Sequence, residues 1–142
     1  MDSENSLAVS LFGEILALDQ LVRNRLAKVL PKGMELSHFS VLNQLSHTKT
    51  ERTPAQIAKS FRVTRAITNT LNKLELSGYI HVRPDWDDAR RKMVSISPAG
   101  IVARNNALTA VTPIINELVS EMGEERLKAI VPILRELRQK FE

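Results

Sequence analysis

The stretch TPAQIAKSFRVTRAITNTLNKLELSGYI, residues 53–80, decides the fold of this chain. It opens on a strong helix start, because Thr53 suits the N-cap, Pro54 the first helical position and Gln56 the third. A Thr at the cap and a Gln three residues later satisfy each other's backbone N–H groups in a capping box. The stretch is therefore predicted to begin with a short helix.

A second, longer helix is predicted after a tight turn at Arg62 and Val63. Thr64 is its predicted N-cap, and it is predicted to end at Ser77, with Gly78 as the residue that follows the helix end. Two helices joined by a short turn form a helix-turn-helix, whose second helix enters the major groove of DNA. The spacing thus predicts a DNA-binding motif.

The second helix has two faces of different character. At 100° per residue, Ile67, Leu71 and Leu74 cluster on one side and polar side chains lie opposite. Arg can bind guanine and Asn can bind adenine by paired hydrogen bonds, whereas Thr and Lys suit phosphates. A solvated face of an ordinary core helix is the alternative, but the capping box, the turn and the hairpin that follows favour DNA. The predicted base contacts are Arg65, Asn69 and Asn72, and the predicted phosphate contacts are Arg62, Thr64, Thr68 and Lys73.

From Tyr79 onward the apolar residues recur with a period of two, which predicts strands. Ile80 and Val82 alternate with polar residues in the first strand, and Val94 and Ile96 do so in the second. The loop between the two strands is DWDDARR, residues 85–91. A hairpin directly behind a recognition helix is predicted to be a wing.

The predicted wing loop carries acids followed by bases. An arginine near a wing tip fits the narrow minor groove, whose negative potential attracts guanidinium groups. Arg90, Arg91 and Lys92 are therefore predicted to anchor the flanking minor groove or the backbone. Acids in such a loop would repel phosphate, so at least one should be paired internally, and Asp88 is expected to pair with Arg90 or Arg62. A solvated charged turn is the alternative.

Long apolar stripes flank this middle part on both sides. Apolar residues at spacings of three and four predict a helix over residues 7–30, and Ser37 is the predicted cap of a short helix behind it. Ser97 followed by Pro98 repeats the cap signal and starts a helix that Gly123 ends. A last helix is predicted over residues 124–140, and Pro113 and Pro132 are expected to kink these two C-terminal helices.

The predicted fold is mainly α, a winged helix-turn-helix with a two-stranded β-wing and a helical dimerisation layer. Residues 1–142 form a single domain, in which residues 36–97 are the DNA-binding lobe. Residues 7–30 and 101–142 are more apolar than the middle part can cover, so they are predicted to be the dimerisation helices of a homodimer.

Composition narrows the class of function. The chain has 142 residues and a formal net charge of +4, with the basic excess between Arg23 and Lys92, which favours a polyanion as partner. Cysteine is absent, which excludes disulfides, thiolate metal sites and thiol redox sensing. No signal peptide and no uninterrupted apolar run of about 20 residues is found, so no membrane partner and a soluble, cytoplasmic protein are expected.

An enzyme is not expected. His38, His47 and His81 are scattered, and none has metal-ligand spacing from another histidine or from paired carboxylates. The chain has no glycine-rich phosphate loop and no nucleophile elbow. We therefore predict no catalytic residue, no metal and no cofactor.

At residues 53–100 the sequence resembles the winged-helix core of the MarR family of bacterial regulators. The resemblance is carried by TPAQIA (53–58), VTRAITNTLNKLE (63–75), GYI (78–80) and DDARRKMVSISPAG (87–100). The Asp88-x-Arg90 pair and the turn after the second strand are its most specific part. Ile96-Ser97 replaces the usual Leu-Thr, and Trp86 stands where many members carry proline.

The resemblance implies homodimers with interleaved terminal helices that bind double-stranded DNA at pseudo-palindromic operators. It also implies a repressor that a small, often phenolic, anionic ligand releases. A winged helix used only for protein contacts, without specific DNA binding, is the alternative function.

A small-molecule effector is expected in a crevice where the dimerisation helices meet the DNA-binding lobe. The side chains expected to line it are equally suited to a core, which is the alternative reading of each. They are Phe12, Leu16, His38, Phe39, Leu42 and Arg62.

Overall fold

The computed structural model describes residues 3–48, 50–61 and 65–142. It confirms the predicted fold class, a mainly helical chain with a two-stranded wing. The described elements, in chain order, are the helices α1 (Ser3–Val29), α2 (Leu36–Ser46), α3 (Pro54–Phe61) and α4 (Arg65–Leu76), the strands β1 (Ile80–Pro84) and β2 (Lys92–Ile96), and the helices α5 (Pro98–Met122) and α6 (Glu124–Lys140).

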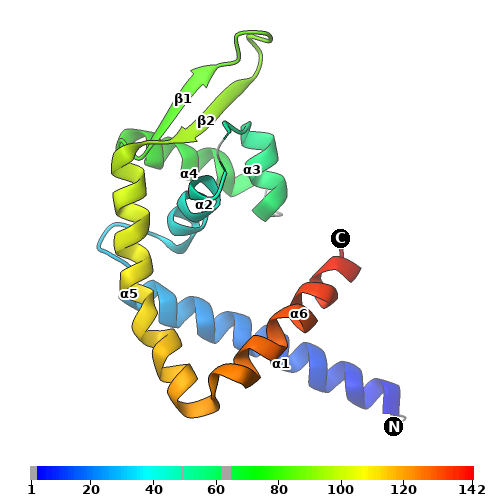
Figure 1. Ribbon diagram of the computed structural model, residues 1–142. Helices are drawn as coiled ribbons and strands as arrows, with labels where there is room; N and C mark the ends of the chain where they lie inside the picture. Colours follow the sequence, from blue (N-terminus) through cyan, green and yellow to red (C-terminus); the bar gives the residue numbers. More distant parts are fainter. Residues whose placement is uncertain (1–2, 49, 62–64) are drawn as a thin grey trace.

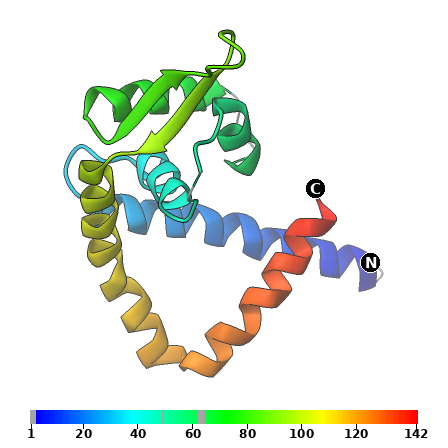
Figure 2. The ribbon, with the colours of Figure 1, turned by 45° about the horizontal axis from the view of Figure 1, so that its top comes forward.

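The elements form two parts of different character. Helices α2, α3 and α4 gather under the hairpin into a lobe, from which the tip of the wing projects (Figure 1). Helices α1, α5 and α6 are long and form an open triangle beside the lobe (Figure 2). Helix α5 belongs to both parts, because its first turns pack on the lobe and its end leads into α6.

The capping box of α3 is present as predicted. The Gln56 N–H donates to the Thr53 hydroxyl at 3.2 Å, and the Thr53 N–H donates to the Gln56 side-chain carbonyl at 2.9 Å. Pro54 begins the helix, where its missing N–H costs no hydrogen bond. The predicted turn at Arg62 and Val63 and the predicted cap Thr64 lie outside the described residues.

The end of α4 also follows its sequence signal. Gly78 has a φ of +77°, a conformation that side chains with a Cβ rarely adopt. The N–H groups of Gly78 and Tyr79 donate to the carbonyls of Glu75 and Leu74, at 2.9 and 3.0 Å. These bonds close the helix and turn the chain into β1.

The start of α2 differs from the prediction. Ser37 was the expected cap, but the helix already begins at Leu36 and Glu35 holds the cap position. The His38 Nδ1 atom accepts a hydrogen bond from the Glu35 N–H at 3.0 Å. The imidazole thus takes the place that a Glu or Gln has at the third helical position of the usual capping box.

The wing contains a pairing that the periodicity did not predict. β1 and β2 are antiparallel, with Ile80 opposite Ile96 and Val82 opposite Val94, as an alternating pattern requires. Arg52 pairs with Val94 from the other side, by backbone hydrogen bonds of 2.9 and 2.7 Å in the two directions. The segment before α3 is therefore attached to the wing by its backbone, although its sequence is polar and carries no strand signal.

The hydrophobic core lies in the lobe. It is built from α2, α3, α4 and the hairpin, and Ala103 closes it from α5. No described residue of α1 or α6 is buried. The fully buried large side chains of the core are Val41, Leu42, Leu45, Ile57, Leu74 and Val94.

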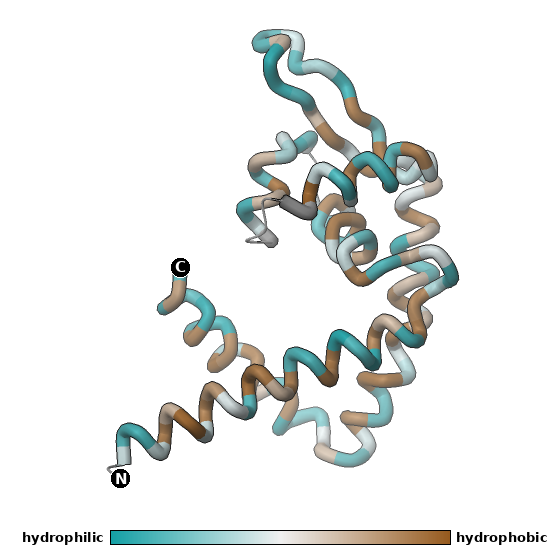
Figure 3. The backbone as a smooth tube through the Cα atoms, turned by 180° about the vertical axis from the view of Figure 1, so that it is seen from behind, coloured by the Kyte–Doolittle hydropathy of each residue, from teal (hydrophilic) through white to brown (hydrophobic). Residues whose placement is uncertain are grey.

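The long helices expose apolar side chains instead. Hydrophobic residues recur along α1, α5 and α6 (Figure 3), and Val9, Leu16, Leu21, Ile133 and Phe141 are each more than 60% exposed. Among the described residues, α1 is long and apolar enough to cross a membrane, although no apolar run in the sequence is uninterrupted for that length. A helix that other protein segments cover can have the same length and composition.

Candidate nucleic-acid interface

Helix α4 has the two faces that the sequence predicts. Ile67, Leu71 and Leu74 are buried against the lobe, whereas Thr68, Asn69 and Asn72 are exposed. The exposed amide and hydroxyl groups project from a helix whose other side is held in the core. This arrangement presents hydrogen-bonding groups of the kind that read base edges in a major groove.

The structure brings part of the predicted DNA site together. Thr68 and Asn72 line a shallow hollow of about 230 Å³ with Lys92, at the junction of α4 and the wing. Asn69 follows Thr68 on the same exposed side of α4. Arg62 and Thr64 lie outside the described residues, and Arg65 is described only as the first residue of α4.

Lys73 has a different neighbour. Its ammonium nitrogen lies 3.6 Å from a carboxylate oxygen of Glu35, on the side of α4 away from the wing. Both side chains are about half exposed or more, so solvent screens this pair and it contributes little to stability. A phosphate that bound Lys73 would have to replace Glu35.

The wing loop is internally paired, which confirms the prediction for its acids. The Asp88 carboxylate accepts from the Arg90 guanidinium Nε at 3.1 Å, and the Asp85 carboxylate lies 3.1 Å from the Arg91 guanidinium. The hydrogen bond from the Arg90 side chain lowers the pKa of Asp88, so this carboxylate stays charged. The Arg90 side chain is 91% exposed, and so Asp88 orients a guanidinium that faces solvent.

Sequence patterns do not predict an ion pair that lies at the loop end of β1. The Arg83 guanidinium donates from Nε to both carboxylate oxygens of Glu51, at 2.9 and 3.0 Å, and it lies 5.0 Å from the ring centroid of Trp86. The hydrogen bonds with Glu51 raise the pKa of Arg83. No local pattern links residues 32 positions apart, and only the pairing of Arg52 with Val94 brings Glu51 to the wing.

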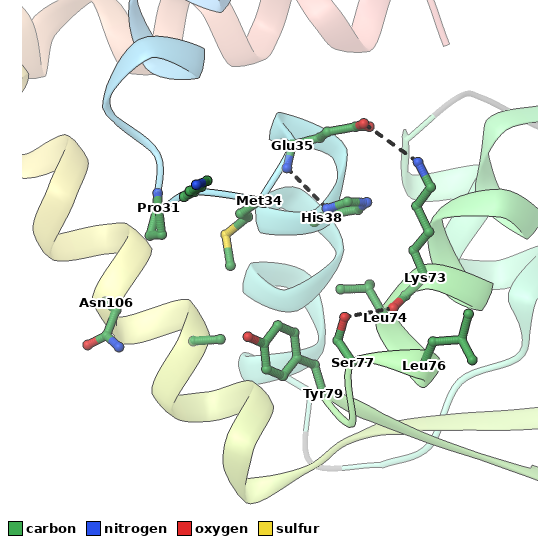
Figure 4. Close-up of a pocket in the computed structure, with 13 residues that line it drawn as sticks. Pro31, Met34, Glu35, His38, Lys73, Leu74, Leu76, Ser77, Tyr79 and Asn106 are labelled. Carbon is green, nitrogen blue, oxygen red and sulfur yellow. Dashed lines mark hydrogen bonds and ion pairs between the residues drawn. The ribbon is translucent and has the colours of Figure 1, made fainter.

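A cavity of about 590 Å³ opens between the loop before α2, the first turn of α2, the end of α4 and α5 (Figure 4). His38 lines it and is only 7% exposed. Its Nδ1 atom accepts from the backbone N–H of Glu35, whereas its Nε2 atom is buried and has no hydrogen-bond partner among the described residues. Burial lowers the pKa of His38, with the nearby Lys73 acting in the same direction and Glu35 against it. The neutral imidazole therefore carries an N–H that a bound molecule could satisfy.

The five predicted effector contacts that the structure describes do not gather in one place. His38 lines the cavity just described, and Phe39 lines a second cavity of about 480 Å³ between α1, α2 and α4. Leu42 is fully buried in the core, which was the alternative to a role in ligand binding. Leu16 is 69% exposed, Phe12 contacts Phe141 with ring centroids 6.5 Å apart, and Arg62 lies outside the described residues.

Comparison with known proteins gives two likenesses in sequence, one to a family and one to a single relative. The sequence model of a family described as "MarR family" matches residues 32–91, which run from the loop before α2 to the end of the wing loop. A curated relative from Bacillus subtilis (strain 168), the "Uncharacterized HTH-type transcriptional regulator YdgG", is 27% identical over 139 residues. The match covers 95% of this chain and 91% of that protein, and so includes the long helices.

Solved structures share the whole fold. A mutant MarR from E. coli, complexed with operator DNA, has a TM-score of 0.79 at 21% identity over 96% of this chain and 99% of that one. The PcaV transcriptional regulator from Streptomyces coelicolor, in complex with its natural ligand, has a TM-score of 0.81 at 14% identity over 96% of each chain. At these identities the two likenesses establish the arrangement of the helices and the wing.

Proposed function

Since the chain belongs to the MarR family of winged helix-turn-helix transcriptional regulators, we propose that it acts as a homodimeric repressor of a pseudo-palindromic operator. It is a DNA-binding regulator and not an enzyme. Beyond DNA binding, we propose that the protein forms a homodimer, that it represses transcription, and that a small-molecule ligand releases it from the DNA. A protein whose partner is the genome acts inside the cell, and we place it in the cytoplasm.

One observation carries the proposed mode of DNA binding. The exposed polar face of α4 adjoins the wing, and Asp88 orients Arg90 beyond it. In the proposed complex α4 enters the major groove, where Arg65, Asn69 and Asn72 read bases. Arg62, Thr64, Thr68 and Lys73 hold phosphates, and Arg90, Arg91 and Lys92 anchor the flanking minor groove or the DNA backbone.

The dimer is proposed from the exposed apolar surface of α1, α5 and α6. Large apolar side chains are exposed along all three helices. A soluble monomer rarely leaves so many of them uncovered by protein. A twofold dimer through this layer sets two α4 helices for major grooves about 34 Å apart, one turn of DNA. Residues 7–30 and 101–142 would then be the dimerisation helices, and residues 36–97 the DNA-binding lobe.

Release by a ligand is proposed for the cavity that contains His38. Its walls come from α2, from α5 and from the recognition helix itself, which contributes Lys73 (Figure 4). A small anion in this cavity could accept a hydrogen bond from His38 Nε2 and replace Glu35 as the partner of Lys73. Because Lys73 belongs to α4, the anion would bind more tightly to the protein conformation in which α4 places Lys73 close to His38. Such a difference in affinity is what moves a protein between DNA-competent and incompetent states. The structure of PcaV in complex with its natural ligand supports the presence of a ligand site in a protein of the same fold.

The first test is selection of bound fragments from random genomic DNA at two salt concentrations. We expect a pseudo-palindrome to be enriched, with an affinity whose logarithm falls by about 0.9 per phosphate contact for each tenfold rise in salt. Salt-independent binding without an enriched motif would instead favour the winged helix as a module for protein contacts. Repression is then tested with a reporter gene behind the enriched site, whose expression should rise when the protein is removed.

A ligand panel tests the release separately. Small carboxylates and phenols, with neutral analogues as controls, are added to the complex with the enriched operator. We expect an anionic compound to lower the operator affinity of the natural protein and to do so less for His38→Gln. An operator affinity unchanged by every compound would remove the ligand from the proposal and leave DNA binding in place.

A further inference from the structure

The wing loop exposes one large apolar side chain. Trp86 is the single tryptophan of the chain, and it is 78% exposed. The rest of the loop, residues 85–91, is charged apart from Ala89. An exposed indole offers a large apolar face and one N–H donor to a partner.

The indole is held in place rather than left loose. The guanidinium of Arg83 lies 5.0 Å from its ring centroid, and Glu51 holds that guanidinium by two hydrogen bonds from Nε. Glu51 precedes Arg52, whose backbone pairs with Val94 in β2. A chain of contacts thus runs from the core strand to the indole, which reduces the entropy lost when the ring binds a partner.

The ring lies on a defined side of the wing. Strand residues alternate between faces, so Val82, which packs against the core, and Arg83 point in opposite directions. The indole beside Arg83 is therefore on the wing face turned away from α4. Lys92 lies on the other face, where it shares a hollow with Thr68 and Asn72 of α4.

The charges around the indole indicate which partner it meets. Two of the three acids in the loop, Asp85 and Asp88, are each paired with an arginine of the same loop, whereas the third, Asp87, is exposed beside the indole. The side chains of Arg90 and Arg91 are 91% and 57% exposed, so the loop presents two guanidinium groups against one exposed carboxylate, which favours a polyanion as partner. In the minor groove an apolar side chain meets deoxyribose, and apolar wedges are common in proteins that bind this groove.

We propose that Trp86 packs its indole against the deoxyribose wall of the minor groove that flanks each half-site, and that it thereby sets how strongly the operator flanks are bound. The inference rests on the proposed placement of the wing in that groove. Trp86 acts as an apolar contact, beside the charged contact of Arg90.

The affinity test compares Trp86→Ala and Trp86→Phe on the enriched operator. The alanine variant should bind about tenfold more weakly, because it loses a buried aromatic contact in both wings of the dimer, and the phenylalanine variant should retain most of the affinity. Thermal unfolding of both variants controls for damage to the wing. Equal affinity of Trp86→Ala and the natural protein would overturn the inference.

A shortened duplex locates the contact. It ends before the flanking minor groove, and on it the natural protein and Trp86→Ala should bind equally well. If the alanine variant were still weaker on this duplex, the effect would come from the wing's structure or from another contact, and the inference would be wrong.

Fluorescence gives an independent readout, since Trp86 is the single tryptophan. Acrylamide should quench its emission freely in the unbound protein and much less in the complex with the full operator. Quenching that stayed unchanged while the protein was fully bound would overturn the inference without touching the proposed function. Failure to bind any operator with salt dependence would instead contradict the proposed function itself.

Discussion

Ser97 joins three parts of the lobe through one side chain and its own backbone. Its hydroxyl donates to the Gly78 carbonyl at 2.6 Å and accepts from the Gly100 N–H at 3.0 Å, and its N–H donates to the Tyr79 carbonyl at 3.0 Å. The residue is 3% exposed. It therefore connects the end of α4, the entry to β1 and the start of α5, and so positions the wing relative to the recognition helix.

Gly100 is required by this close packing. A Cβ at Gly100 would lie 2.0 Å from the Tyr79 carbonyl oxygen, whereas a Cβ at Gly13 in α1 would meet no atom within 4 Å. We expect Gly100→Ala to lower the free energy of unfolding by about 1–3 kcal/mol or more, because the backbone must move apart. Gly13→Ala is the matched control and should keep or raise stability, by up to about 1 kcal/mol. Urea denaturation measures both, and equal effects of the two substitutions would contradict the assignment.

His38 makes stability depend on pH. Its pKa is lowered from 6.5 by burial, so the unfolded chain binds the proton more readily than the folded one. The stability that this group contributes is complete above pH 6.5 and is lost as the pH falls from there toward the folded-state pKa. The natural protein should thus lose more stability than His38→Gln between pH 7.5 and 5, measured by thermal unfolding across that range. Parallel pH profiles of the two proteins would contradict this.

At the scale of elements, α4 carries different contacts on its two exposed edges. Asn72 adjoins Lys92 at the wing, whereas Lys73 lies beside Glu35. Asn72→Ala should cost about 1–3 kcal/mol on the operator and relax the preference at one base pair. Lys73→Ala should weaken all sequences alike and reduce the salt slope by about one. Binding titrations on the operator and on single-base variants, at several salt concentrations, separate the two. The reverse pattern would exchange the proposed roles.

At the scale of the whole molecule, the long helices determine assembly. Arg25 and Glu117 pair at 2.9 Å and join α1 to α5, yet the apolar side chains of these helices remain exposed. The structure of one chain is therefore a core-forming lobe attached to an unfinished helical layer. A second copy completes it in the proposed dimer.

A charge in that layer should break the dimer. Leu16 in α1 is 69% exposed and Leu76 at the end of α4 is 89% exposed. Leu16→Glu places a carboxylate in the proposed interface, where it loses its hydration, and should give monomers in analytical ultracentrifugation. Leu76→Glu, on the lobe, is the matched control and should stay dimeric. If Leu16→Glu sedimented as the natural protein does, α1 would lie outside the interface at this point.

Much of the fold could be predicted because its signals are local. The Thr53–Gln56 capping box, the reversal at Gly78 and the cap of α5 at Ser97 each depend on residues within four positions of one another. The buried and exposed faces of α4 follow from its period, and the Asp88–Arg90 pair lies within one loop. Such interactions form in almost any tertiary surroundings, so the sequence by itself determined the helices, the hairpin and the polar recognition face.

The tertiary structure alone decided which distant residues meet. It brought Arg52 to Val94 and Glu51 to Arg83, residues far apart in the chain. It also left the buried Nε2 of His38 without a partner among the described residues. No periodicity encodes them, because they exist only once the core has brought the elements together. For the same reason His38 and Phe39, neighbours in sequence, line different cavities: successive residues of a helix point about 100° apart, and the elements packed on each side make the walls.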